Sequence, residues 1–98
     1  MRVMRDALEF EWDDGNRGKN FQKHGITDAE SEESFFDPAK KILEDRLHSD
    51  KEKRYILLGK TKSGKILFIV FTIRKEKIRI ISSRTFNKKE RTLYEKES

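Results

Sequence analysis

The sequence predicts one α+β domain, in which a curved antiparallel sheet is combined with two N-terminal helices and a short C-terminal helix. In the second half of the chain, apolar runs alternate with short polar turns, as in successive hairpins. Helix-capping residues occur in the first half and again after the last apolar run. Because 98 residues leave room for one hydrophobic core, we expect residues 10–96 to form a single domain and residues 1–9 a flexible extension.

The start of the domain predicts a strand followed by a helix. Residues 10–12 alternate apolar, polar and apolar side chains, which is typical of a short strand. An aspartate at position 13 or 14 can cap a helix that runs to about His24, and Gly25 suits the left-handed position at which many helices end. We expect Phe21 of this helix to face the core.

A second helix is predicted after Thr27. Thr27 and Glu30 have the spacing of a capping box, and the acidic start of the segment suits the positive end of a helix dipole. Pro38 stops the helix, because it disfavours helical backbone in the residue before it. Residues 40–44 can then form a strand, and residues 45–53 form a polar loop.

The rest of the chain predicts three strands and a helix. The strands are expected at residues 54–60, 66–73 and 78–85, with turns between them. The middle strand is apolar on both faces, which is typical of a central strand that is covered on both sides. Asn87 can cap the last helix, with Glu90 as its capping-box partner.

Charge is divided unevenly along the chain. Residues 1–52 carry 9 basic and 14 acidic side chains, whereas residues 53–96 carry 14 basic and 3 acidic ones. A basic half on a small domain favours a phosphate-rich ligand. The alternative is a solvated charged surface that has no partner.

Several classes of protein are disfavoured. The chain has no Cys, and it shows neither a paired-His metal spacing nor a Gly-rich phosphate loop. We therefore expect no cofactor and no metal. The N-terminus lacks the apolar segment of a signal peptide, and no apolar run reaches the length of a membrane span. A cytoplasmic protein without a membrane partner is expected.

Arginines are the main candidates for binding an anion. In a regular strand Arg79 and Arg84 point to opposite faces unless a bulge intervenes. Arg84 is favoured for a site because it lies at the strand end beside the last helix, whereas Arg79 is equally well explained by pairing with a carboxylate of the acidic second helix. Arg54 can bind a phosphate through two hydrogen bonds, or it can pair with Asp45 or Glu52.

Acid–base candidates are fewer. His48 lies in the polar loop, and imidazole suits proton transfer near neutral pH, although an exposed loop histidine more often has no such role. Glu90 and Tyr94 share one face of the last helix, as a possible base and proton donor. Their alternative roles are the capping box for Glu90 and packing over the core for Tyr94.

Short motifs along the chain resemble the BrnT family, the toxins of type II toxin–antitoxin modules. They cover about residues 10–95, and their order and spacing together carry the resemblance. The matching positions are Phe10–Asp13, Asn20, Lys23–Ile26, Phe35–Asp37, Asp45, His48, Glu52, Arg54, Gly59, Arg79–Ser82, Arg84, Asn87, Glu90, Arg91, Tyr94 and Glu95.

The resemblance implies a RelE-like fold and an endoribonuclease that arrests growth. It also implies neutralisation by a BrnA-type antitoxin with a ribbon-helix-helix DNA-binding part, so that operator DNA is contacted only through the toxin–antitoxin complex. The competing interpretation is a basic domain without catalysis, which binds nucleic acid or an antitoxin-like partner.

Metal-independent cleavage of RNA requires a base for the 2′-OH, a positive charge for the phosphate and an acid for the leaving oxygen. We expect Arg54 and Arg84 to stabilise the charge. The base is then His48 or Glu90, and the acid is Tyr94, His24 or Lys23. The side chains expected to contact RNA are Lys23, His24, Arg79, Lys88, Lys89 and Arg91.

Overall fold

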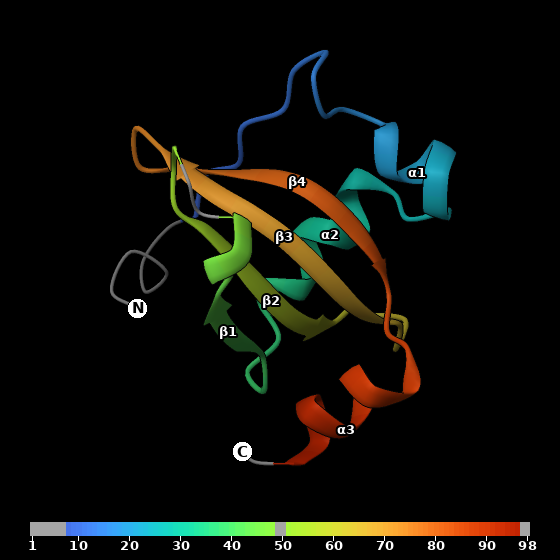
Figure 1. The fold of residues 1–98 in the computed structure, drawn as a ribbon. Coiled ribbons are helices and arrows are strands. Elements are labelled where there is room, and N and C mark those ends of the chain that lie inside the picture. Colours follow the sequence, from blue (N-terminus) through green and yellow to red (C-terminus); the bar gives the residue numbers. More distant parts are fainter. Residues whose placement is uncertain (1–7, 49–50, 97–98) are drawn as a thin grey trace.

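A computed structural model describes residues 8–48 and 51–96. Its strands form one antiparallel sheet in the order β1-β2-β3-β4, so that strands adjacent in sequence are adjacent in space (Figure 1). The predicted α+β architecture, with two N-terminal helices and a C-terminal one, is confirmed. The elements are α1 (Lys19–His24), α2 (Asp28–Ser34), β1 (Lys41–Glu44), the 3-10 turn η2 (Arg46–His48), β2 (Arg54–Lys60), β3 (Ile66–Arg74), β4 (Lys77–Thr85) and α3 (Lys88–Lys96).

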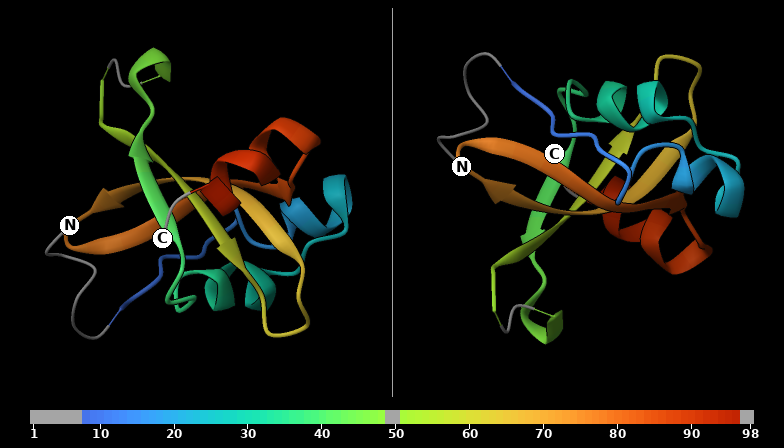
Figure 2. Two further views of the ribbon diagram at one scale, coloured as in Figure 1. Left: turned by 90° about the horizontal axis from the view of Figure 1, so that it is seen from below. Right: turned by 90° about the horizontal axis from the view of Figure 1, so that it is seen from above.

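The two faces of the sheet are covered differently. Helices α1 and α2 lie over one face, whereas α3 and η2 lie on the opposite side (Figure 2). The sequence predicts that β3 is covered on both faces, but the structure differs. Ile69 and Phe71 are fully buried on the helix-covered face, whereas Phe68 and Val70 on the other face are half-buried. We call this second side the open face.

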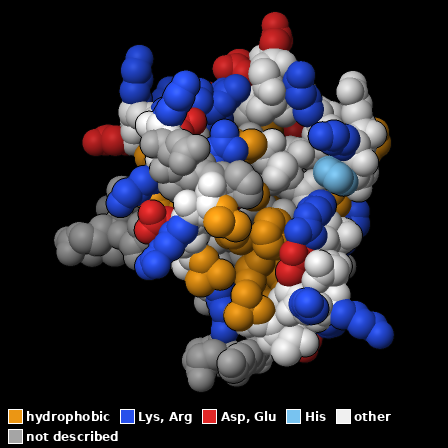
Figure 3. All heavy atoms as spheres, viewed as in Figure 1, with side chains coloured by type: hydrophobic (Ala, Val, Ile, Leu, Met, Phe, Trp, Pro, Cys, Tyr) orange, Lys and Arg blue, Asp and Glu red, His pale blue; other side chains and the backbone are white. Residues whose placement is uncertain are grey.

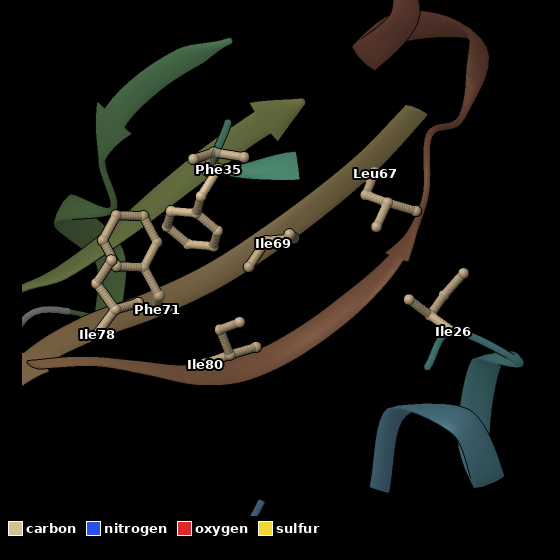
Figure 4. Packing of buried hydrophobic residues seen from close by; sticks show 8 residues of the cluster. Ile26, Phe35, Leu67, Ile69, Phe71, Ile78 and Ile80 are labelled. Carbon is tan, nitrogen blue, oxygen red and sulfur yellow. The ribbon is translucent and has the colours of Figure 1, made fainter. Parts of the chain in front are cut away.

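The hydrophobic core lies between the sheet and α2. Phe35, at the end of α2, packs edge-on against Phe71 of β3, with ring centroids 5.0 Å apart (Figure 4). Aromatic pairs with this geometry add to the stabilisation from apolar burial. The cluster consists of Ile26, Phe35, Leu57, Leu67, Ile69, Phe71, Ile78 and Ile80.

Helix α2 begins and packs as its sequence indicates. The predicted capping box is present, because Thr27 Oγ1 accepts a hydrogen bond from Glu30 N at 3.1 Å and Glu30 Oε1 accepts one from Thr27 N at 2.9 Å. The helix then lies close against β2 at Gly59. A Cβ at position 59 would lie 2.5 Å from the carbonyl oxygen of Ser34. Any larger residue would therefore force the helix away from the sheet.

Helix α1 is shorter than predicted, and the expected cap at position 13 or 14 is wrong. Asp13 instead accepts a hydrogen bond from Gly15 N at 2.8 Å in a turn that precedes the helix. The predicted core position of Phe21 is also wrong, because this side chain is 58% exposed. Asn20 faces the sheet in its place. The expected end is confirmed, since Gly25 adopts a φ of 73°.

The outer edge of β4 is closed by the N-terminal segment. Ile78 N donates to Glu9 O and Glu11 N donates to Ile78 O, both at 2.8 Å, so the strand predicted over residues 10–12 is reduced to one parallel bridge at Phe10. Farther along, Asn16 and Asn20 use side-chain amides to pair with β4. The edge therefore offers little backbone to another strand. Residues 1–7 of the expected extension lie outside the described residues.

A bulge in β4 changes which side chains share a face. Arg84 pairs with Phe68 and Arg79 pairs with Thr72, and the register shifts between these two pairs. Phe68 and Thr72 are four residues apart on a regular strand, so they point the same way. Arg79 and Arg84 therefore both lie on the open face, in contrast to simple alternation. No helix in the described part of the chain is long and apolar enough to cross a membrane.

Candidate active site

The open face contains an apolar depression with basic side chains around it (Figure 3). A cleft of about 360 Å³ lies here, between η2 and the bulge of β4. Its centre is formed by half-buried apolar side chains from β2, β3 and β4. The lining residues are Asp45, Leu47, Arg54, Ile56, Phe68, Val70, Ile81 and Ser82. We call this depression the cleft.

Arg84 borders the cleft through Phe68, which lines it. The guanidinium carbon of Arg84 lies 4.2 Å from the centroid of the Phe68 ring, a cation–π contact. Nη1 and Nη2 of Arg84 donate to the two carboxylate oxygens of Glu90, at 2.8 and 2.6 Å. This two-pronged ion pair with Glu90 fixes the plane of the guanidinium, because Nη1 and Nη2 are both held.

One edge of this guanidinium remains available for a ligand. Arg84 donates through Nη1 to Thr85 O at 3.2 Å as well as to Glu90. Among the described residues, none accepts a hydrogen bond from Nε of Arg84. An arginine carries five N–H donors in a rigid fork, and the Nε–Nη2 edge can bind two oxygens of a phosphate.

Glu90 is held in its ionised form. The hydrogen bonds from Arg84 lower the pKa of the Glu90 carboxyl, and the backbone N–H of Asn87 also favours the charged form. The predicted capping box is confirmed, since Glu90 N in turn donates to Asn87 Oδ1 at 2.9 Å. A carboxylate with a lowered pKa and with both oxygens engaged is a poor proton acceptor. Its geometry suits the positioning of Arg84.

Arg54 lies at the other end of the cleft, and the turn that ends at His48 borders it. Arg54 begins β2, is half-buried and lines the cleft. Its Cα pairs with that of Thr72, so it approaches from the side opposite Arg84. His48 ends η2, directly after the cleft residue Leu47, and its side chain lies outside what the structure describes.

Tyr94 is engaged away from the cleft. Its hydroxyl donates to Asp37 Oδ2 at 2.6 Å, and its ring packs edge-on against Phe86. Burial, together with the hydrogen bond to Asp37, raises the pKa of Tyr94 to about 12. Asp37 also accepts a hydrogen bond from Lys60 N at 2.8 Å. The contact therefore ties α3 to the segment after α2 and to the end of β2.

Arg79 is also paired with carboxylates. Its Nη1 lies 3.1 Å from Glu11 Oε1 and 2.9 Å from Asp13 Oδ2, and its side chain is 14% exposed. The hydrogen bonds that Arg79 donates to Asp13 and Glu11 raise the pKa of its guanidinium. These partners belong to the N-terminal segment, not to the acidic helix. Arg79 thus joins that segment to the sheet.

The other predicted RNA-contacting residues fall into two groups. Lys23 and His24 line a second cavity, between α1 and β4. On α3, three of the basic side chains that the structure describes are exposed, and one of them, Arg91, pairs with Glu95 at 3.1 Å. The other two are Lys88 and Lys89. Within the described part of the chain, no group of three His, Asp or Glu residues could hold a metal ion.

Comparison with known families decides the relationship. A family model described as the ribonuclease toxin BrnT of type II toxin–antitoxin systems matches residues 12–90. The chain belongs to the BrnT family. This family membership implies an RNA substrate and an antitoxin partner, and the four-stranded curved sheet with three helices is consistent with a RelE-like fold. No curated protein matches the sequence.

Sequence reasoning missed three parts of this surface. Phe68 was expected to be covered, yet it stacks on Arg84. Ile81 and Ser82 sit at the bulge, which no local pattern indicated. Lys19 lies four residues before Lys23 and lines the same cavity. The spacing of the two lysines is the one signal that was available, because it places both on the same side of a helix.

Proposed function

We propose that this BrnT toxin cleaves RNA in the cleft of the open face and does so without a metal ion. The observation that carries the proposal is the Arg84 guanidinium, which Phe68 and Glu90 hold at the border of the cleft with its Nε–Nη2 edge available. Preorganised donors of this kind stabilise developing negative charge without reorganisation during the reaction.

In the proposed reaction, the 2′ oxygen of one nucleotide attacks the adjacent phosphorus. The bond from phosphorus to the 5′ oxygen breaks, so the products are a 2′,3′-cyclic phosphate and a 5′-hydroxyl. The proton of the 2′-OH passes to a base, and an acid supplies a proton to the leaving 5′ oxygen. Arg84 and Arg54 contact the phosphate oxygens from opposite sides and stabilise the additional charge.

The contacts of the acid–base candidates guide the assignment of their roles. Glu90 acts as a positioning residue, since both of its oxygens are engaged and its pKa is lowered by Arg84. Tyr94 holds α3 in place through Asp37. His48 is the proposed base, because the turn that carries it borders the cleft. His24 is the proposed acid, from the cavity beside the bulge, where Lys23 is proposed to contact RNA.

The antitoxin is proposed to cover the same face. Apolar side chains are exposed at the border of the open face, where Leu43 is 43% exposed and Leu47 is 86% exposed. A BrnA-type antitoxin with a ribbon-helix-helix part would place an apolar or acidic segment here, exclude RNA and neutralise the positive field. Operator DNA would then be contacted through the antitoxin. The affinity of the complex should fall as salt concentration rises, whereas an affinity unaffected by salt would contradict the charge argument.

Expression in bacteria tests the proposed activity. The wild-type chain should arrest growth and degrade total RNA, and Arg84→Ala should relieve both effects. Arg74→Ala is a matched control, because Arg74 also forms a two-pronged pair with a glutamate, Glu52, outside the cleft. Circular dichroism of the purified variants checks that both are folded.

The alternative is a basic domain that binds RNA or an antitoxin without cleaving RNA. The exposed apolar side chains beside the cleft favour it, since a protein partner alone would explain them. A wild-type chain that binds RNA intact and leaves growth unaffected would establish this alternative.

A further inference from the structure

A second cavity lies on the other side of the β4 bulge, between α1 and the sheet. Its volume is about 420 Å³. The wall on α1 carries the basic side chains Lys19 and Lys23 together with His24, all of which are exposed. No described carboxylate lines the cavity. Its positive charge is therefore not balanced by acidic groups of the same wall.

A buried amide contributes to the same wall. Asn20 lines the cavity and is 4% exposed. Its Oδ1 accepts a hydrogen bond from Ser83 N at 3.0 Å, which fixes the orientation of the amide. Among the buried side-chain atoms that the structure describes, Nδ2 of Asn20 is the one without a hydrogen-bond partner. A buried donor without an acceptor costs stability, and an oxygen ligand would remove this cost.

The cavity adjoins the cleft. Ile81 and Ser82 line both, because the bulge directs neighbouring residues of β4 to the same side. Bulges often lie beside active sites, where they redirect side chains. A single RNA strand held in the cleft can therefore continue over the bulge to α1 without crossing another element.

We propose that this cavity binds a phosphate of the RNA strand that flanks the scissile phosphate. The inference rests on the proposed function, because the cleft defines which phosphate is cleaved. Lys19 and Lys23 neutralise the flanking phosphate, and Nδ2 of Asn20 donates to one of its oxygens. The contact is the same before and during the reaction, so it lowers KM and leaves kcat nearly unchanged.

The experiment uses a chimeric oligonucleotide with one ribonucleotide in a 2′-O-methyl background, so that one bond can be cleaved and the register is defined. Lys23→Ala should raise KM about tenfold with a similar kcat, as expected for one lost charge-assisted hydrogen bond. Lys77→Ala, which removes a lysine at the opposite end of β4, should change neither constant. Asn20→Asp retains the hydrogen bond from Ser83 N. It should weaken RNA binding more than Lys23→Ala does, because it places a carboxylate near the phosphate.

A second measurement identifies the phosphate. A series of oligonucleotides carries a single uncharged methylphosphonate at successive positions. At the contacted position, the methylphosphonate should lower the affinity of the wild type for the oligonucleotide. It should not lower the affinity of Lys23→Ala, since the two changes remove the same interaction. Binding of the fully 2′-O-methylated strand should also depend less on salt in Lys23→Ala than in the wild type. The slope of log affinity against log salt concentration should be less steep by about 0.7.

The outcomes are separable from those of the proposed function. Binding of the fully 2′-O-methylated strand does not require cleavage, so the site can be tested in a protein that is inactive. Equal effects of Lys23→Ala and Lys77→Ala, or additive losses at every methylphosphonate position, would overturn the proposal. So would a Lys23→Ala variant that binds RNA normally and loses affinity for the antitoxin, because the cavity would then serve the protein partner.

Discussion

The two faces of β3 differ in how they use side chains of similar size. Towards α2, Leu67, Ile69 and Phe71 are 0% exposed and belong to the core. Towards the open face, Phe68 and Val70 remain half-buried and line the cleft. Apolar character therefore serves two purposes in one strand. The helix-covered face stabilises the fold, whereas the open face provides an apolar floor on which arginines are arranged.

The largest expected effect is on the helix-covered face. Phe71→Ala should lower the free energy of unfolding by about 3–5 kcal/mol, because it leaves a cavity beside Phe35. Val70→Ala, one residue away on the open face, should cost about 1 kcal/mol. Urea denaturation of both variants measures the difference. Equal losses of unfolding free energy in the two variants would show that the open face is packed in solution.

A large effect on activity is expected from Arg84→Gln on the open face. Loss of one preorganised donor to the phosphate should lower kcat by about 10²–10³-fold. The free energy of unfolding should fall by no more than about 1 kcal/mol, since the pair with Glu90 is partly exposed. Arg74→Gln serves as the control, with a comparable pair outside the cleft. A normal kcat for Arg84→Gln would remove this residue from the site.

A smaller effect distinguishes positioning from proton transfer at Glu90. Glu90→Gln keeps an oxygen for Asn87 N and loses the charge that orients Arg84. We expect kcat to fall about tenfold, with the acidic limb of the pH–rate profile unchanged. If Glu90 were the base, the fall would be about 10²–10⁴-fold and that limb would disappear. Steady-state kinetics from pH 4 to 9 decides between the two roles.

The smallest effect concerns the attachment of α3. Tyr94→Phe removes the bond to Asp37 and should cost about 1 kcal/mol in the free energy of unfolding. The pKa of Tyr94 is raised from 10.0 to about 12, so the unfolded chain loses this proton first. The contribution of this hydrogen bond to the free energy of unfolding is therefore complete below pH 10, and it is lost as pH rises from 10 towards 12. Denaturation of wild type and variant should differ below pH 10 and converge above pH 12; a constant difference would refute this linkage.

Local signals predicted much of the fold. The bounds of β2 are those predicted, and both capping boxes are present, because the residues that specify them lie within a few positions. The start of α1 was predicted too early, since the side chain of Asp13 stabilises a turn before the helix. Phe21 could not be placed reliably, because a helix of six residues offers little periodicity.

The site depended on contacts that no local pattern contains. Arg54 and Arg84 were identified from their residue type and position, and both lie at the cleft or its border. The bulge that brings Arg79 to the same face has no sequence signature here. Tyr94 and Asp37 are 57 positions apart, so their bond, which separates Tyr94 from the cleft, follows from the tertiary fold.

The most direct test is the chemistry of the RNA ends. Purified protein is incubated with the single-ribonucleotide substrate in excess chelator, and the products are analysed by mass spectrometry. A guanidinium-based site predicts cleavage at unchanged rate, with a 2′,3′-cyclic phosphate on one fragment and a 5′-hydroxyl on the other. Cleavage that stops in chelator and returns with a divalent metal, or that leaves a 5′-phosphate, would contradict it.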